Sequence, residues 1–340
     1  MSELNSAKVR ELLYGTWAAQ AVYAAARLDL ADHVADGAGD VEELAERTGT
    51  NPDALYRLMR ALASVGMFHE EGSRRFAMTP PAQCLRTDGE DSVKDLALFY
   101  GNEVFRSYSR IVDSVRSGTP AFDAEYGTTL WEHMAKVPET SDAFRRGMGA
   151  SSWREQLPLP RTYDFSGINR LVDAGGGEGT MLAAILHEQP DMRGVLVELP
   201  GGIDRTMRHF TDAGVADRCT LVEGSAFDEL PHGDGFVMSC VMHALDDESG
   251  LRALRRIRDA IEPDGRLVII ERIVAPGDEP GLAKTLDLTM LLMNGGKERT
   301  ESEWHSLLAA ADFKLTRIVP LPYFSGGAEL AAIEATPIHR

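Results

Sequence analysis

Hydrophobic and polar residues follow two different periods along the chain. In the segment 7–35, apolar residues such as Val9, Leu12 and Leu13 recur at helical spacing, which predicts amphipathic helices. From about Asn169 onward, short apolar runs alternate with helical patterns, which is typical of a parallel, doubly wound α/β sheet. The predicted strands are 170–173, 194–198, 219–223, 235–240, 266–271, 314–319 and 328–335. The last two are expected to form an antiparallel hairpin through the glycine-rich turn 325–327.

A winged-helix pattern occupies residues 40–78. Asp40 is the predicted N-cap of a helix that ends at Gly49, and Asn51 begins a second helix that ends at Gly66. Two short strands, 67–70 and 75–78, follow. This layout suits either DNA binding or a structural, dimerising role. A DNA-binding module would need a basic face, so we favour the second reading.

The segment 90–155 is predicted to be helical with a break at 118–120. Large apolar side chains at helical spacing usually form a core, although some could wall a pocket for a flat substrate. The residues that we predict for such a substrate wall are Phe105, Trp131, Met148, Trp153, Met290 and Asn294.

The first strand of the predicted sheet is joined to a helix by a turn of three consecutive glycines that follows Asp173. Glycine permits positive φ and lets the backbone lie against a ligand, while the helix N-terminus offers free N–H groups. Thr180, not glycine, stands at the sixth position of a dinucleotide fingerprint. Glu198 ends the next strand, where a carboxylate can bind both ribose hydroxyls. The motif predicts a nucleotide-like ligand, and its spacing favours S-adenosylmethionine.

Polar residues also follow the carboxyl ends of later strands, where ligands bind in open α/β sheets. Ser225 follows the third strand, His243 follows the fourth, and Glu271 ends the fifth after an apolar run. A carboxylate in that place is costly without a partner, and a histidine paired with it would form an oriented general base. Glu298 is a second candidate carboxylate, although it could instead be an acid at a helix N-terminus.

The composition of the chain limits the classes of protein to which it can belong. Hydrophobic residues make up 44% and charged residues 26%, and no apolar run approaches the roughly 20 residues that span a bilayer. The N-terminus lacks a signal-peptide layout, so we expect a cytoplasmic protein without a membrane partner. The formal net charge of -18 disfavours nucleic acid. The cysteines are widely spaced and the carboxylates scattered, so no metal site is expected.

These motifs resemble those of the two-domain S-adenosylmethionine-dependent O-methyltransferases of plant caffeate and bacterial natural-product pathways. The glycine turn resembles the family's D-x-G-G-G-x-G, and residues 198–200 resemble its acidic-Leu-Pro. Residues 242–248, M-H-A-L-D-D-E, resemble L-H-D-W-x-D-E. The G-G-K-E-R-T of residues 295–300 is the most specific agreement.

The resemblance implies a general base, His243, that is flanked by Glu271 and Glu298. It implies S-adenosylmethionine as cofactor, S-adenosylhomocysteine as its product and a hydroxylated aromatic small molecule as substrate. The cofactor-binding residues that it indicates are Asp173, Gly175, Gly177, Glu198, Leu199, Gly224, Ser225, Ala226, Phe227, Ser239 and Cys240. Ala244 and Leu245 depart from the family's Asp and Trp, and Ser225, Ala226 and Ser239 also differ from its usual residues.

The expected organisation is a winged-helix dimerisation domain at 1–100, a helical linker at 101–155 that contributes to the substrate pocket, and a Rossmann-like catalytic domain at 156–340. A homodimer through the N-terminal domain is implied by the resemblance. Three alternatives stay open: C-methylation of an activated aromatic ring, a relative repurposed for a step other than methyl transfer, and a cofactor-sensing transcription factor.

Overall fold

The computed structural model describes residues 2–89, 91–156, 158–199, 203–321 and 330–339. The chain forms two compact units, and each unit contains two separate stretches of sequence. The first unit is Met1–Ser109 with Trp131–Ser151, and the second is Arg110–Leu130 with Ser152–Arg340. The predicted linker 101–155 therefore contributes residues to both units.

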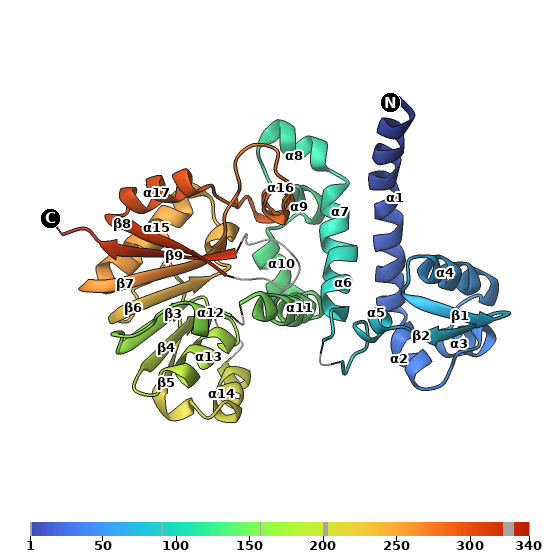
Figure 1. Cartoon of the computed structure of the whole chain (residues 1–340), viewed down its shortest axis with the longest axis horizontal. Coiled ribbons are helices and arrows are strands. Elements are labelled where there is room, and N and C mark those ends of the chain that lie inside the picture. The colour runs from blue at the N-terminus through green and yellow to red at the C-terminus, as the bar shows by residue number, and fades with distance from the viewer. Residues whose placement is uncertain (1, 90, 157, 200–202, 322–329, 340) are drawn as a thin grey trace. The chain divides into compact units, whose positions relative to one another are not determined.

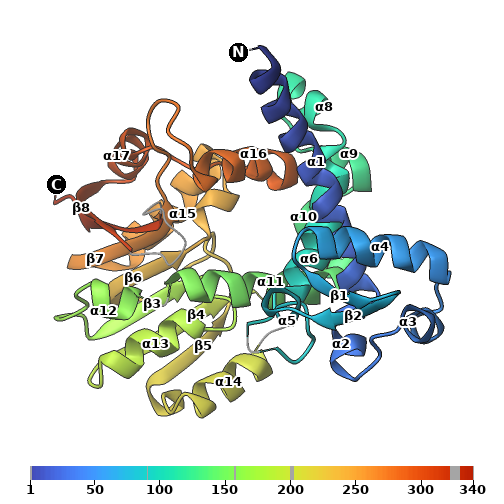
Figure 2. The same cartoon turned by 45° about the vertical axis from the view of Figure 1, so that its right-hand side comes forward.

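The first unit consists of helices and a two-stranded wing (Figure 2). Its helices are α1 (Ser2–Arg27), α2 (Leu30–Ala35), α3 (Val41–Thr48), α4 (Pro52–Ser64), α5 (Pro80–Gln83), α6 (Lys94–Phe99), α7 (Phe105–Tyr108), most of α10 (Leu130–Lys136) and most of α11 (Pro138–Gln156), with a π-helix at Tyr100–Val104. Its strands are β1 (Phe68–Gly72) and β2 (Arg75–Met78), which pair antiparallel.

The predicted caps of the winged helix are present. The Asp40 side chain accepts a hydrogen bond from the Glu42 N–H at the start of α3, and Gly49 ends that helix with a φ of 65°. The Asn51 side chain accepts from the Ala54 N–H at the start of α4. These local bonds satisfy N–H groups that a helix leaves unpaired, so the short helices begin and end where the sequence specifies.

The second unit contains a seven-stranded sheet of order β5-β4-β3-β6-β7-β9-β8 (Figure 1). Its strands are β3 (Arg170–Ala174), β4 (Arg193–Glu198), β5 (Cys219–Glu223), β6 (Gly233–Ser239), β7 (Ile261–Arg272), β8 (Phe313–Pro320) and β9 (Leu330–Pro337). Strands β3 to β7 pair in parallel, whereas β9 is antiparallel to both neighbours. The doubly wound sheet and its antiparallel last pair are therefore confirmed. The predicted turn 325–327 lies outside the described residues.

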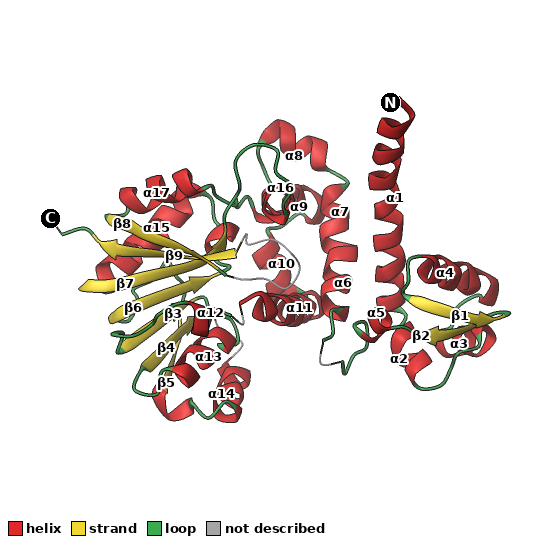
Figure 3. Ribbon diagram, in the orientation of Figure 1, coloured by secondary structure: helices red, strands yellow, loops and turns green. Residues whose placement is uncertain are grey.

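Helices cover both faces of this sheet (Figure 3). On one face they are α12 (Leu159–Thr162), α13 (Thr180–Glu188) and α14 (Ile203–Asp212), and on the other α15 (Asp247–Ala260) and α17 (Glu301–Ala310). The same unit also contains α8 (Ile111–Ser117), α9 (Ala121–Tyr126) and α16 (Leu282–Asn294), which pack against one another. Val172 of β3 packs in a core with α15 and α17, and Leu171 packs in a second core with α12 and α13. Because both faces of the sheet are buried, its parallel strands read as continuous apolar runs.

The strand order determines where a ligand can bind. The chain passes from β3 to β4 on one side, and β6 returns to the other side of β3. Such a reversal opens a crevice beyond the carboxyl ends of the strands. Asp173, Glu198, Ser239 and Glu271 stand at the carboxyl ends of four neighbouring strands. Among the described helices, none is both long and apolar enough to cross a bilayer.

Candidate active site

The glycine turn after β3 needs its glycines for two different reasons. Gly175 and Gly177 have φ values of 84° and 59°, in the left-handed region that favours glycine. Gly176 does not, but a Cβ there would lie 2.1 Å from Asp173 Oδ2 and 2.6 Å from Leu196 Cδ1. A Cβ at Gly177, by contrast, would meet no atom within 4 Å. The turn therefore packs tightly on the sheet side and leaves open space beside Gly177.

Two buried polar groups beneath this turn and at the end of β6 have no hydrogen-bond partner. Asp173 is 0% exposed and neither of its carboxyl oxygens is bonded; the Ser239 Oγ is also buried and unpaired. Burial and the nearby charge of Glu198 raise the pKa of Asp173 to about 8. Unsatisfied buried polar groups are costly, and they indicate a ligand that would bond to them. Together with the open glycine turn, these groups fit a nucleotide-like cofactor that carries an amino acid.

Glu198 lies at the end of β4, where the sequence analysis predicted a ribose-binding carboxylate. Its Oε2 accepts from the Gly177 N–H at 2.8 Å, and its Oε1 accepts from the Leu199 N–H at 3.0 Å. Its own carbonyl accepts from the Gly224 N–H at 3.0 Å. Glu198 thus connects the glycine turn to the loops after β4 and β5, three places at which the cofactor was predicted to bind.

The loop after β5 contains the predicted adenine contacts. The Ser225 N–H donates to Asp228, and the Ser225 Oγ accepts from the Phe227 N–H, so the loop is closed on itself. Ala226 packs against the core, and the Arg252 guanidinium lies 4.7 Å from the centre of the Phe227 ring. At the end of β6, Cys240 has a φ of 53°, and its N–H donates to Ile270.

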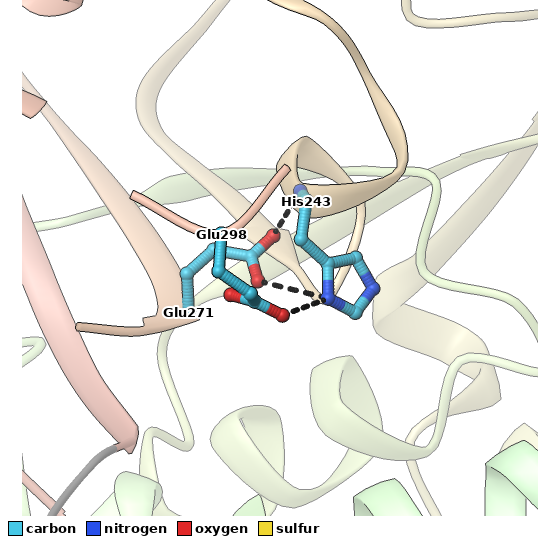
Figure 4. A group of neighbouring side chains, drawn as sticks. All are labelled: His243, Glu271 and Glu298. Atoms are coloured by element: carbon cyan, nitrogen blue, oxygen red, sulfur yellow. Dashed lines mark hydrogen bonds and ion pairs between the residues drawn. The ribbon is translucent and has the colours of Figure 1, made fainter. Parts of the chain in front are cut away.

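His243 and two glutamates form a hydrogen-bonded group (Figure 4). His243 lies in a 3-10 turn, Met242–Ala244, beyond β6. Its Nδ1 is 2.8 Å from Glu298 Oε1 and 3.7 Å from Glu271 Oε2, and its backbone N–H donates to Glu271 Oε1 at 3.1 Å. Both carboxylates are buried, at 1% and 3% exposure. The other ring nitrogen, Nε2, points away from them (Figure 4).

The buried carboxylates change the proton affinity of the imidazole. Burial alone would lower the pKa of His243, but the charge of Glu271 and the hydrogen bond to Glu298 raise it to about 9, against a small opposing effect of Arg272. Burial raises the pKa of Glu271 above the ordinary carboxyl range, and the charge on His243 opposes that shift. A nitrogen with a raised pKa accepts a proton more strongly, so the group has the properties of an oriented general base.

The carboxylates that are scattered in the sequence are together in space. Among the described residues, His243, Glu271 and Glu298 are the one group of histidine, cysteine or acidic side chains that could together hold a metal ion, because their donor atoms lie within 4.8 Å of one another. The resemblance implied that Glu271 and Glu298 flank His243, but the spacing of the residues gave no metal site, because spacing along the chain does not reveal which strand ends are neighbours. Nδ1 is already bonded to a carboxylate, so we interpret the group as a proton-accepting triad.

The segment before α17 holds Glu298 in place. Thr300 caps α17 and forms a capping box with Glu303, so the acids of the first turn are Glu301 and Glu303 and not Glu298. The Glu298 N–H donates to Asp287 at 2.9 Å. A Cβ at Gly296 would lie 2.1 Å from the His243 carbonyl oxygen. Sequence reasoning missed the contributions of Asp287 and Gly296, although the G-G-K-E-R-T motif pointed to this segment.

The predicted substrate-wall residues belong to both units. Phe105 and Trp131 are partly exposed in the first unit, where Trp131 lies edge-on to Phe144 at 6.2 Å, and Met148 is half-buried there. In the second unit, Met290 and Asn294 lie on α16. The side chain of Trp153 lies outside the described residues. That these residues line one pocket stays a prediction.

Family models match most of the chain. A model described as the O-methyltransferase domain matches residues 108–314, and a model described as the O-methyltransferase dimerisation domain matches residues 10–88. The first match includes the glycine turn and the His243 triad, and the second includes the winged helix.

Proteins similar to this chain catalyse more than one kind of reaction. It is 37% identical over 329 residues to the phenazine O-methyltransferase PhzM of Lysobacter antibioticus, and the aligned region covers 96% of this chain and 95% of that protein. It is 36% identical over 332 residues to the aclacinomycin 10-hydroxylase RdmB of Streptomyces purpurascens, with coverage of 93% and 88%. It also resembles the solved structure of NcsB1, an O-methyltransferase from neocarzinostatin biosynthesis, in complex with S-adenosylmethionine and 2-hydroxy-5-methyl naphthoic acid. That match has a TM-score of 0.83 and 32% identity, and it covers 94% and 96% of the two chains.

Proposed function

The chain belongs to the two-domain S-adenosylmethionine-dependent O-methyltransferases, and from this premise we propose that it methylates a hydroxyl group of an aromatic small molecule of bacterial natural-product metabolism. The observation that carries the proposal is the bond from His243 Nδ1 to Glu298, because it leaves Nε2 free to receive the proton of an acceptor. The phenazine and naphthoic acid compounds named for the relatives support an aromatic acceptor.

Each residue of the proposed site has its own role in the reaction. When bound, S-adenosylmethionine supplies an electrophilic methyl group on a sulfonium. His243 removes the proton from the acceptor hydroxyl, and Glu298 and Glu271 fix the tautomer and orientation of the imidazole. Glu198, at the end of β4, would hold the ribose hydroxyls, and the turn at Gly175 and Gly177 would hold the amino-acid end. Asp173 and Ser239 have the unpaired oxygen atoms that the polar groups of the cofactor would satisfy.

The direct test is methyl transfer by the purified protein. It is incubated with S-adenosylmethionine and a panel of hydroxylated aromatic acceptors, and S-adenosylhomocysteine and the product mass are followed. We expect a gain of one methyl group, and an O-methyl ether in the NMR spectrum of the product. A C-methyl arene would instead indicate ring methylation, which needs the same base.

A second candidate is a cofactor-dependent step other than methyl transfer. It is favoured by the hydroxylase RdmB among the relatives and by Ala244 and Leu245, which depart from the family pattern next to the base. Binding of S-adenosylmethionine with turnover of an acceptor but no methyl gain would favour this candidate.

The rate of methyl transfer is expected to rise with pH, with a midpoint above the ordinary histidine value of about 6.5. Only neutral His243 can accept a proton, and its pKa is raised to about 9. In a Glu298→Gln variant the pKa of His243 should fall, because a charge and a charged hydrogen bond are lost. The ascending limb of the plot of methyl-transfer rate against pH should therefore move to lower pH in this variant, and the rate reached at high pH should be lower than in the wild type.

The measurement is kcat/KM from about pH 6 to about pH 10. A Glu301→Gln variant is the matched control, because that side chain is 66% exposed in the first turn of α17. The control should keep the wild-type profile. A Glu298→Gln profile that coincides with the wild-type profile would contradict the proposed triad.

We propose that α1 mediates homodimerisation. Its exposed apolar side chains recur at helical spacing and include Trp17 at 69% exposure. They are Val9, Leu12, Leu13, Tyr14 and Trp17. A continuous apolar face of this kind on a soluble domain is typical of a protein interface, and the dimerisation-domain match begins on this helix.

A Leu13→Glu/Trp17→Glu double variant is therefore expected to sediment as a monomer under conditions in which the wild type is a dimer. A Lys8→Glu variant on the same helix, at a side chain that is 65% exposed and polar, is the control and should keep the wild-type mass. Analytical ultracentrifugation measures both. A double variant that retains the dimer mass would exclude α1 as the interface.

A further inference from the structure

The turn that carries His243 rests on a fully buried arginine. Arg299 is 0% exposed, and its backbone is held beside the end of β7, because the Val274 N–H donates to the Arg299 carbonyl at 3.0 Å. A buried guanidinium is costly unless its N–H groups are bonded. The partners of those groups therefore indicate what the side chain supports.

Two of the partners are carbonyls on either side of the base. Arg299 Nη1 donates to the Met242 carbonyl at 2.9 Å, and Nη2 donates to the Leu245 carbonyl at 2.9 Å. Met242 begins the turn that presents His243, and Leu245 follows it. The two terminal nitrogens of the planar guanidinium form a rigid fork that can bond to both carbonyls at once. A lysine ammonium is a single compact charge and cannot reproduce this fork.

The guanidinium is itself held from two further sides. Asp247 Oδ1 accepts from Arg299 Nε at 3.0 Å and lies 2.9 Å from Nη2. The guanidinium carbon lies 5.3 Å from the centre of the Trp304 ring. The orientation of the fork is thus fixed by α15 and α17, so the turn at His243 is bonded to a rigid group.

We propose that Arg299 is a positioning residue for methyl transfer, which fixes the backbone turn of His243 so that the imidazole keeps its bond to Glu298 and presents Nε2 to the acceptor. The inference rests on the proposed role of His243 as the base. Glu298 holds the ring and Arg299 holds the backbone. Two adjacent residues of the G-G-K-E-R-T segment therefore hold the base at two points.

The test compares Arg299→Lys with a matched arginine elsewhere in the same unit. Arg218 donates to three backbone carbonyls, those of Leu186, Gln189 and Met192. It precedes the edge strand β5, which β4 and β3 separate from β6, whereas His243 follows the carboxyl end of β6. Both substitutions keep the charge and remove a carbonyl-binding fork. Arg299 is fully buried and Arg218 is half-buried, so the two variants are compared at a temperature at which both are folded, where a difference between them in catalysis reports position and not folding.

Arg299→Lys is expected to lower kcat by about 10- to 100-fold, because misplacing a catalytic group by roughly 1 Å has that effect. The Kd for S-adenosylhomocysteine should stay within about twofold of wild type, since Arg299 bonds to none of the predicted cofactor contacts. The ascending limb of the pH profile should move to lower pH, as the bond between the imidazole and Glu298 is weakened. Arg218→Lys should change none of these three quantities.

A readout without turnover separates this inference from the proposed function. The NMR titration of the His243 imidazole should show a lower pKa in Arg299→Lys than in the wild type, and this holds even if the enzyme methylates no acceptor. If Arg299→Lys does not fold, Asp247→Asn leaves both carbonyl bonds but loosens the fork. It should then shift the same titration in the same direction by a smaller amount. Wild-type kcat, pH profile and titration in the folded variant would overturn the proposal.

Discussion

A His243→Gln variant is expected to lose about 10²- to 10⁴-fold in kcat, the usual contribution of a positioned general base. Glutamine can still donate an amide N–H to Glu298, so the buried carboxylate keeps a partner while the proton acceptor is lost. The bond at 2.8 Å between Nδ1 and Glu298 makes this substitution less disruptive than alanine. Binding of S-adenosylhomocysteine should be close to wild type, because no predicted cofactor contact is removed.

The measurement is the single-turnover rate, which isolates the chemical step from product release. A His305→Gln variant is the control, since that side chain is 54% exposed on α17. It should keep the wild-type rate. A His243→Gln enzyme with an unchanged single-turnover rate would show that another group removes the proton, and the triad would then be structural.

A Gly176→Ala variant is expected to weaken cofactor binding by about 10- to 100-fold, the equivalent of the roughly 1–3 kcal/mol that overpacking a tight site costs. The added Cβ would lie 2.1 Å from Asp173 Oδ2 and 2.6 Å from Leu196 Cδ1. Neither neighbour can retreat easily, because both are buried between the sheet and its helices. The turn must therefore move toward the open side, where the ligand is proposed to bind.

Calorimetric titration with S-adenosylhomocysteine measures this effect. Gly72→Ala is the control, because a Cβ at Gly72 meets no atom within 4 Å and its φ is not in the left-handed region. The control should bind normally. Unchanged affinity in Gly176→Ala would mean that the cofactor does not lie against this turn, and the assignment of Gly175, Gly177 and Glu198 to it would fail.

Much of the fold is encoded locally and could be predicted from the sequence. The side chains of Asp40 and Asn51 bond to N–H groups two or three residues away, and Gly49 ends its helix through its own backbone conformation. The alternation of apolar strands and helical patterns likewise predicts a doubly wound sheet, because the periods 2 and 3.6 are properties of short segments. These features need no distant contact, so the residue pattern is sufficient.

The candidate site was predictable only in part. His243, Glu271 and Glu298 were identified by position and by resemblance, but the sequence left a helix-terminal role for Glu298 open as an alternative. The capping box between Thr300 and Glu303 removes that alternative, since it places Glu298 before the helix and in the core. Whether Glu298 lies at a helix terminus or is buried beside His243 depends on where its side chain points in the folded protein, and a single sequence does not contain that information.

The sequence by itself determined the helices and strands, the glycine turn and the types of side chain that form the candidate site. Only the tertiary structure decided that Glu271 and Glu298, 27 residues apart, converge on one imidazole, that Gly176 is required by Asp173 and that Arg299 supports the turn of the base. The physical reason is the range of the interactions. Caps and periodic patterns act within a few residues, whereas these contacts exist only once the strand order has brought distant segments to the same edge of the sheet.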